Sequence, residues 1–258
     1  MDLGIRGRKA LLSGASRGLG KAAAIALARD GVDITILART RATLERTAGE
    51  IRALGVEVTT VVGDVTTAEG RNAALAACPE PDILINSADG SLPGDFRHYT
   101  RADWLAALDA MMLAPIEMMR ATVDGMMARK FGRIVNISSR SAKIAQHENA
   151  LSNGARSGLI GFVAGLSRQT IVHNVTINNI LPGIFDTDAQ KHHIDVLVRQ
   201  TGKAFGQIWN ERAAGNPARR YGRAEEFGAY CAFLCSAQAG FITGQNLLID
   251  GGSYPGTY

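Results

Sequence analysis

Short apolar runs alternate with longer amphipathic stretches along nearly the whole of this 258-residue chain. The apolar runs have the length and composition of buried strands, whereas the longer stretches carry apolar residues at helical spacing. Strands are predicted at 10–13, 33–38, 56–62, 83–86, 133–138, 176–181 and 246–250. Helices are predicted at about 18–30, 40–54, 67–77, 101–130, 152–172 and 223–236.

This alternation predicts a parallel sheet, because consecutive parallel strands need a crossover connection that is usually a helix. We expect the α/β class, with a single doubly wound domain over residues 1–258, a seven-stranded parallel sheet and helices on both faces. The segment at about 188–217 is expected to cover the substrate cleft as a lid. Its Trp209 either stacks on a substrate or packs the lid onto the body.

Composition narrows the class of protein further. The net charge is only +4 and the basic residues are scattered, which argues against a nucleic acid as partner. No apolar run reaches the roughly 18 residues of a membrane span, and no secretory segment precedes the first strand, so we expect a cytoplasmic protein with no membrane partner. Cys78, Cys231 and Cys235 have no metal-ligand spacing and are expected to be buried thiols.

A glycine-rich turn, with the sequence SGASRGLG, joins the first predicted strand to the first predicted helix. Glycine permits positive φ and a close approach of the backbone to a ligand, and the N–H groups that begin a helix favour an anion. In this strand–turn–helix context the turn predicts a Rossmann-type dinucleotide site with the pyrophosphate at the helix start. The residues expected to contact the cofactor here are Gly14, Ser16, Arg17, Gly18, Leu19 and Gly20.

The residue after the second strand selects the nucleotide. Proteins that bind the non-phosphorylated dinucleotide usually carry an acid about 20 residues beyond the glycine turn. Here Arg39 lies 19 residues after Gly20, with no carboxylate beside it, and Arg17 adds a second positive charge. Two guanidinium groups suit a 2′-phosphate, so NADP(H) is preferred to NAD(H); the alternative is that both are ordinary surface arginines.

Five ordered motifs together resemble the short-chain dehydrogenase/reductase family, and within it the 3-oxoacyl-acyl-carrier-protein reductase group. Besides the glycine turn they are Asp64-Val65, Asn86-Ser87-Ala88, the segment from Pro182 to Thr187, and residues 244–252. The resemblance implies cofactor-site roles for Asp64, Val65, Asn86, Ala88, Pro182, Gly183, Ile184 and Thr187. It also implies a small-molecule or acyl-carrier-bound carbonyl substrate and a homodimer or homotetramer.

The catalytic positions are where the chain departs from this family, whose chemistry moves a hydride between nicotinamide and a carbonyl carbon. Aligned on residues 132–139, the family serine falls on Ser139, the tyrosine position holds Ser152 and the lysine position holds Arg156. The position of the relay asparagine holds Met111. A serine hydroxyl is a weaker acid than a phenol, and an arginine stays charged while still binding ribose hydroxyls. We therefore expect an atypical active site with a substitute proton donor.

Three side chains are candidates for that donor. His147 is the first, the alternative being a solvated or substrate-contacting loop histidine. Asp89 is the second, or else simply a turn residue, and Lys143 is the third unless it is exposed. The adjacent His192 and His193 face apart on a helix and have no evident third partner, so no metal site is expected.

Three functions remain open. The first is an NADP(H)-dependent oxidoreductase acting on a carbonyl or alcohol, with Ser139, Ser152, Arg156 and His147 as its catalytic residues and Arg156 also at the cofactor. The second is a non-redox enzyme on the same scaffold. The third is an NADP(H)-binding protein that catalyses nothing.

Overall fold

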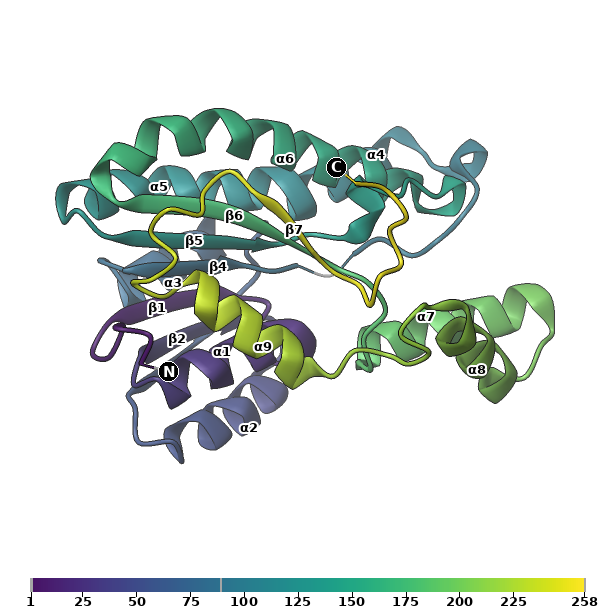
Figure 1. Ribbon diagram of the computed structural model, residues 1–258, viewed down its shortest axis with the longest axis horizontal. Coiled ribbons are helices and arrows are strands. Elements are labelled where there is room, and N and C mark those ends of the chain that lie inside the picture. The colour runs from purple at the N-terminus through teal and green to yellow at the C-terminus, as the bar shows by residue number, and fades with distance from the viewer. Residues whose placement is uncertain (1, 89, 258) are drawn as a thin grey trace.

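A computed structural model describes residues 2–88 and 90–257 of the chain. In these residues seven strands form one parallel sheet in the order β3-β2-β1-β4-β5-β6-β7, which confirms the predicted α/β class and the sheet (Figure 1). The strands are β1 (Lys9–Ser13), β2 (Asp33–Ala38), β3 (Val58–Val62), β4 (Ile83–Asn86), β5 (Gly132–Ile137), β6 (Val175–Pro182) and β7 (Asn246–Ile249). The order reverses between β1 and β4, and this is the place where doubly wound sheets bind ligands.

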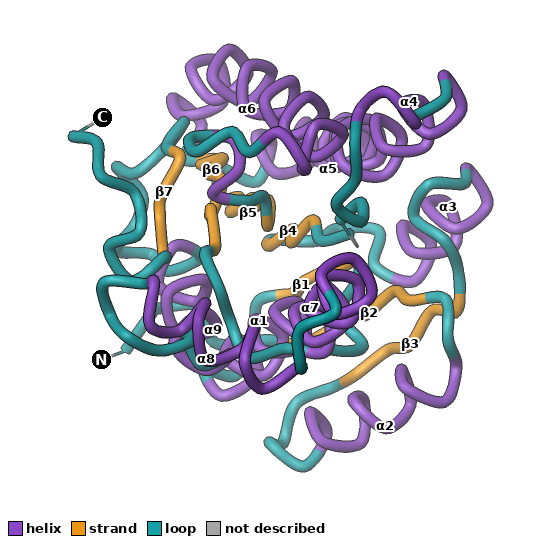
Figure 2. Tube along the Cα trace, turned by 90° about the vertical axis from the view of Figure 1, so that its right-hand side faces the viewer, coloured by secondary structure: helices purple, strands orange, loops and turns teal. Residues whose placement is uncertain are grey.

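Helices cover both faces of the sheet, with α1, α2 and α9 on one side and α4, α5 and α6 on the other (Figure 2). The helices are α1 (Gly18–Arg29), α2 (Arg41–Arg52), α3 (Ala68–Ala77), α4 (Arg101–Leu108), α5 (Ala114–Ala128), α6 (Ala150–Thr170), α7 (Asp188–Thr201), α8 (Phe205–Gly215) and α9 (Ala224–Leu234). The helices α7 and α8 extend beyond the sheet at the carboxyl ends of the strands (Figure 1).

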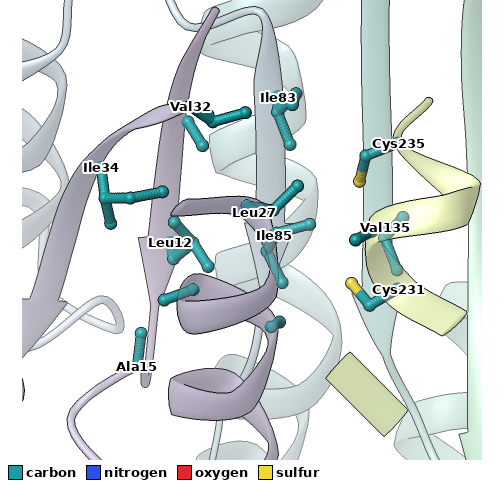
Figure 3. Packing of buried hydrophobic residues seen from close by; sticks show 14 of the residues in the cluster. Leu12, Ala15, Leu27, Val32, Ile34, Ile83, Ile85, Val135, Cys231 and Cys235 are labelled. Carbon is teal, nitrogen blue, oxygen red and sulfur yellow. The ribbon is translucent and has the colours of Figure 1, made fainter. Parts of the chain in front are cut away.

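Alternation along the strands produces two separate cores, because successive side chains point to opposite faces. Leu12 of β1 packs with α1 and α9 in one core, which also contains Cys231 and Cys235 (Figure 3). Leu11 packs in the other core with Cys78 and the helices α5 and α6. All three cysteines are buried free thiols, as predicted.

The structure differs from the predicted helix pattern in two places. The helix expected at 101–130 is interrupted by a π turn, Asp109–Leu113, just before Pro115 in the first turn of α5. Proline lacks the N–H needed for the regular helical hydrogen bond, which favours a break at this point. The lid segment, for which no helix was predicted, contains α7 and α8.

A ladder of four asparagine side chains crosses the sheet near the carboxyl ends of β4, β5 and β6. The amide of Asn86 donates to Asn136 at 2.9 Å, Asn136 donates to Asn179 at 3.0 Å, and Asn179 donates to Asn246 of β7 at 2.9 Å. These residues occupy matching positions in the strand register, so each amide meets the next one directly. The ladder ties together the strands that support the catalytic half of the cleft.

Candidate active site

The glycine turn closes tightly against the strand next to it. The hydroxyl of Ser13 donates to the carbonyl of Ser87 at 3.0 Å and accepts from the N–H of Ser87 at 3.0 Å. Gly14 has φ +60°, and a Cβ added there would lie 2.6 Å from the carbonyl oxygen of Ser87. Glycine is therefore required at this position both by conformation and by space.

The start of α1 fits the pyrophosphate of a dinucleotide. A Cβ at Gly20 would lie 2.5 Å from the carbonyl oxygen of Gly14, so the helix begins directly against the turn. Arg17, the residue before α1, makes no capping side-chain hydrogen bond to the helix, and the first turn contains no acid. The first N–H groups of a helix and its dipole both favour an anion, which an acidic side chain would otherwise repel.

A cleft of about 460 Å³ runs from this turn to Arg156 of α6. Most of the predicted cofactor residues line it: Gly14, Ser16, Arg17, Gly18, Leu19, Gly20, Arg39, Asp64, Val65, Ala88, Arg156, Pro182 and Thr187. Asn86, Gly183 and Ile184 do not line it. A second hollow of about 720 Å³ lies between α1 and α9, but it contains neither the interior of the glycine turn nor any residue of α6.

Arg39 and Asp64 both line one end of the cleft. The carboxylate of Asp64 accepts from the N–H of Thr66 at 2.9 Å and from its hydroxyl at 2.8 Å. The pKa of Asp64 is lowered chiefly by that backbone hydrogen bond, and the charge of Arg39 lowers it further. This end of the cleft thus presents one anionic and one cationic side chain to a ligand.

Ser152 and Arg156 form a buried pair one turn apart on α6. The Nε of Arg156 donates to the Ser152 hydroxyl at 3.1 Å, and its Nη1 donates to the carbonyl of Ile137 at 2.9 Å. Burial lowers the pKa of Arg156 to about 10, so the group remains a cation at neutral pH. The site therefore holds a fixed positive charge directed at a serine hydroxyl.

Ser141 joins this pair, although motif spacing did not predict it. Its hydroxyl lies 3.4 Å from that of Ser152, whereas the hydroxyl of Ser139 accepts the N–H of Ser141 and so caps a short 3₁₀ turn. Ser138, also unpredicted, lines the cleft. Met111 is buried in the π turn, an irregularity that is frequent at functional sites. The run of hydroxyl residues after β5 was the available signal for Ser138 and Ser141.

Two of the predicted proton donors make their contacts away from this pair. The side chain of His147 is 98 % exposed, with its Nδ1 3.2 Å from a carboxylate oxygen of Glu148. The ammonium of Lys143 lies 5.5 Å from the ring centre of Tyr254. Asp89 lies outside the described residues, so its position relative to the cleft is not defined.

The lid has a small core of its own. Trp209 stacks on Tyr221 with ring centres 3.9 Å apart and on Phe205 at 5.9 Å, and Ile194 and Ile208 are buried beside them. Trp209 therefore packs within this cluster.

Residues 2–88 and 90–257 contain no cluster of three or more potential metal ligands, His192 and His193 included. Within the same residues no helix is long and apolar enough to cross a bilayer.

Comparison with known proteins identifies the family. The family model described as enoyl-(acyl carrier protein) reductase matches residues 14–254. The chain is 31% identical over 254 residues to acetoacetyl-CoA reductase of Cupriavidus necator, covering 96% of this chain and 99% of that protein. It is 29% identical over 256 residues to a 3-oxoacyl-[acyl-carrier-protein] reductase of Pseudomonas aeruginosa, covering 98% and 99%. The crystal structure of L-sorbose reductase from Gluconobacter frateurii, complexed with NADPH and L-sorbose, matches with a TM-score of 0.92 at 28% identity and 98% coverage of both chains. The chain belongs to the short-chain dehydrogenase/reductase family.

Proposed function

We propose that the chain is an NADP(H)-dependent oxidoreductase that interconverts a carbonyl and an alcohol on a small-molecule or acyl-carrier-bound substrate. The observation that carries the proposal is the glycine cradle at Gly14 and Gly20, which leaves room for a backbone-bound ligand and none for a side chain. Family membership supports it, because relatives include acetoacetyl-CoA reductase and a reductase solved with NADPH.

The proposed cofactor contacts follow the course of the cleft. The N–H groups at the start of α1 would hold the pyrophosphate, Arg17 and Arg39 the 2′-phosphate, and Asp64 with Val65 the adenine. At the other end, the nicotinamide and its ribose would be held by Ala88, Arg156, Pro182, Gly183, Ile184 and Thr187. When bound, NADPH supplies a hydride to the substrate carbonyl carbon.

We further propose an active site that is atypical for the family, with Ser152, Arg156 and Met111 in place of its tyrosine, lysine and asparagine. Because Arg156 donates to the Ser152 oxygen, the Ser152 proton is available to bind a substrate oxygen. An aliphatic hydroxyl is too weak an acid to act as the proton source, so Ser152 positions the oxygen and polarises it only modestly. A lost general acid costs on the order of 10²–10⁴ in rate.

His147 would have to leave Glu148 and turn in from solvent to supply the proton. We therefore expect His147→Ala to retain whatever reductase activity the wild type has. A loss of activity in this variant, with NADPH binding unchanged, would restore His147 as the donor.

A titration of the protein with NADPH, followed by NADPH oxidation with a panel of carbonyl compounds, tests the proposal. We expect saturable binding and slow oxidation.

The triple variant Ser152→Tyr, Arg156→Lys and Met111→Asn should raise the rate of NADPH oxidation on the order of 10²-fold or more. Ser157→Tyr, at an exposed position of the same helix, is the matched control for an added phenol. Absence of NADPH binding at millimolar concentration would refute the function.

A catalytically silent NADP(H)-binding protein is the second candidate, and the serine at position 152 favours it. This candidate predicts NADPH binding without oxidation by any compound of the panel. The triple variant then separates the two functions, because a silent protein with a rebuilt pocket gains no activity from it.

We propose that the chain forms a homodimer or homotetramer through the outer face of α6. A Cβ added at Gly161 or Gly165 would meet nothing within 4 Å, and Phe162 beside them is 37% exposed. Small residues allow a second helix to approach closely, so Gly161→Arg should lower the mass measured by light scattering to that of a smaller assembly.

A further inference from the structure

Polar side chains from three separate segments gather beside the cleft. Arg140 begins the 3₁₀ turn that follows β5, two residues after a cleft-lining serine. Gln190 follows the last cleft-lining residue of α7, and His193 lies one turn further along, on the same helix face. Arg212 comes from α8; burial lowers the pKa of Arg140 and of His193, and the charge of Arg212 lowers both further.

Two nitrogen donors in this cluster are buried without an acceptor. Neither the Nε of Arg212 nor the Nε2 of Gln190 has a hydrogen-bond partner among the described residues. The guanidinium of Arg140 is held by a hydrogen bond to the Ser253 hydroxyl. A buried donor without an acceptor costs about 1–3 kcal/mol. A ligand that accepts hydrogen bonds from these two nitrogens would remove that cost.

The cluster also keeps a positive charge, since neither Arg140 nor Arg212 forms an ion pair with a carboxylate among residues 2–88 and 90–257, and the neighbouring carboxylates have other partners. Asp250 accepts from the N–H groups of Gly252 and Tyr254 at 3.0 and 2.9 Å. Glu148 lies 3.2 Å from His147, and Asp186 lies 3.0 Å from Lys191. Burial and the two guanidinium groups lower the pKa of His193 to about 4, so its imidazole is neutral at pH 7 and does not add to that charge.

We propose that Arg140 and Arg212 bind a carboxylate of the substrate, so that the substrate is an oxo acid or the corresponding hydroxy acid. This assignment rests on the proposed function, which places the reacting carbonyl in the adjacent cleft. The unpartnered Nε of Arg212 lies on a guanidinium edge that matches both oxygens of a carboxylate, and Gln190 supplies a further donor. Tyr221 stacks on Trp209 of α8 and its hydroxyl donates to the Trp209 carbonyl at 3.3 Å, so it acts as a positioning residue for the helix that carries Arg212.

Calorimetric titration of the NADP⁺-loaded protein tests the proposal without turnover. The probes are three oxo acids of increasing length (pyruvate, acetoacetate and 4-oxopentanoate), each paired with its methyl ester. In at least one pair the acid should bind tenfold or more tightly than the ester. Arg212→Met and Arg140→Met should each weaken acid binding about tenfold and leave ester binding unchanged. Arg199→Met, an exposed arginine of α7, is the matched control and should change neither.

Two results would overturn the carboxylate site: no pair in which the acid binds better, or an acid preference that survives both substitutions. Circular dichroism and retained NADP⁺ binding show that a variant is folded; should Arg212→Met fail this check, Arg212→Gln replaces it. Failure of the proposed function is a different observation, because NADP⁺ itself would then not bind to the wild type.

Discussion

The two ends of the cleft are made of different parts of the chain. At the nucleotide end the surface is largely backbone, shaped by Gly14 and Gly20 at the start of α1. At the other end, which we call the catalytic end after the proposed function, side chains such as Ser138 and Arg156 line the cleft, and Ser152 accepts a hydrogen bond from Arg156. The nucleotide end therefore depends on backbone conformation, whereas the catalytic end depends on the identity of its side chains.

This difference determines which amino-acid substitutions each end of the cleft can tolerate. A side chain at Gly14 collides with the backbone of the next strand, so a change there disturbs the fold itself. By contrast, α6 is anchored in the core by Leu151, Ala155 and Leu159, whatever occupies positions 152 and 156. A scaffold of this kind can keep the backbone of the glycine turn while the side chains at positions 152 and 156 vary.

The strongest test is Gly14→Ala. It combines a φ of +60° with a Cβ 2.6 Å from a carbonyl oxygen, so NADPH affinity should fall on the order of 100-fold or more. Gly161→Ala is the matched control, because a Cβ there meets nothing within 4 Å. Fluorescence titration with NADPH measures both. Equal affinities of the two variants would contradict a backbone-built nucleotide end.

The second test concerns the asparagine ladder beneath the catalytic end. Asn136→Ala leaves the side chains of Asn86 and Asn179 without their partners in a buried place, and should lower the free energy of unfolding by about 2–4 kcal/mol. Asn246→Ala removes only the terminal hydrogen bond of the ladder, at a partly exposed position, and should cost about 1 kcal/mol. Urea unfolding at one fixed protein concentration compares them. Similar losses would mean that the ladder does not act as a unit.

The third test concerns a charged side chain at the nucleotide end. Arg39→Ala should weaken NADPH binding about tenfold or more and leave NADH binding nearly unchanged, because a charge-assisted hydrogen bond contributes about 1.5–3 kcal/mol. Arg41→Ala, an exposed arginine two residues further on and outside the cleft, controls for the loss of net charge. If both variants bind NADPH equally well, Arg39 does not select the phosphorylated nucleotide.

The same contrast explains how much of the molecule could be predicted from sequence. Strand and helix periodicity predicted the parallel sheet, and the glycine spacing predicted the turn at its carboxyl edge, because both are local properties of the chain. The two lid helices were not predicted because their few buried residues, such as Ile194 and Ile208, pack mainly against each other. The hydrogen bonds of Asn136 depend on which residues of the neighbouring strands lie opposite it, and the sequence of one strand does not reveal that register.

Side-chain positions at the catalytic end were the hardest to predict. Motif spacing pointed to Ser139, but a 3₁₀ turn brings Ser141 to Ser152 and leaves Ser139 capping that turn. His147 is five residues from Ser152 in sequence, yet it lies on a turn that directs its ring into solvent. Nearness in sequence therefore says little about contact where short irregular turns connect the elements.

The smallest expected effect is in the dependence of stability on pH, and it tests the arginine cluster next to the catalytic end. Burial lowers the pKa of His193 from 6.5 to about 4. Between those values the unfolded chain takes up a proton that the folded chain does not, so the free energy of unfolding should fall as the pH falls from 6.5 to 4 and level off below. A shift of this size corresponds to about 3 kcal/mol, which solvent screening of a partly exposed ring reduces to about 1–2 kcal/mol.

His193→Gln should remove that part of the pH dependence, because glutamine does not titrate. His192→Gln, on the exposed side of the same helix, controls for the helix propensity of glutamine. Urea unfolding at pH 7.5, 6 and 4.5 measures the slope. An unchanged slope in His193→Gln would show that the His193 ring is not buried in solution as it is in the structure beside Arg140 and Arg212.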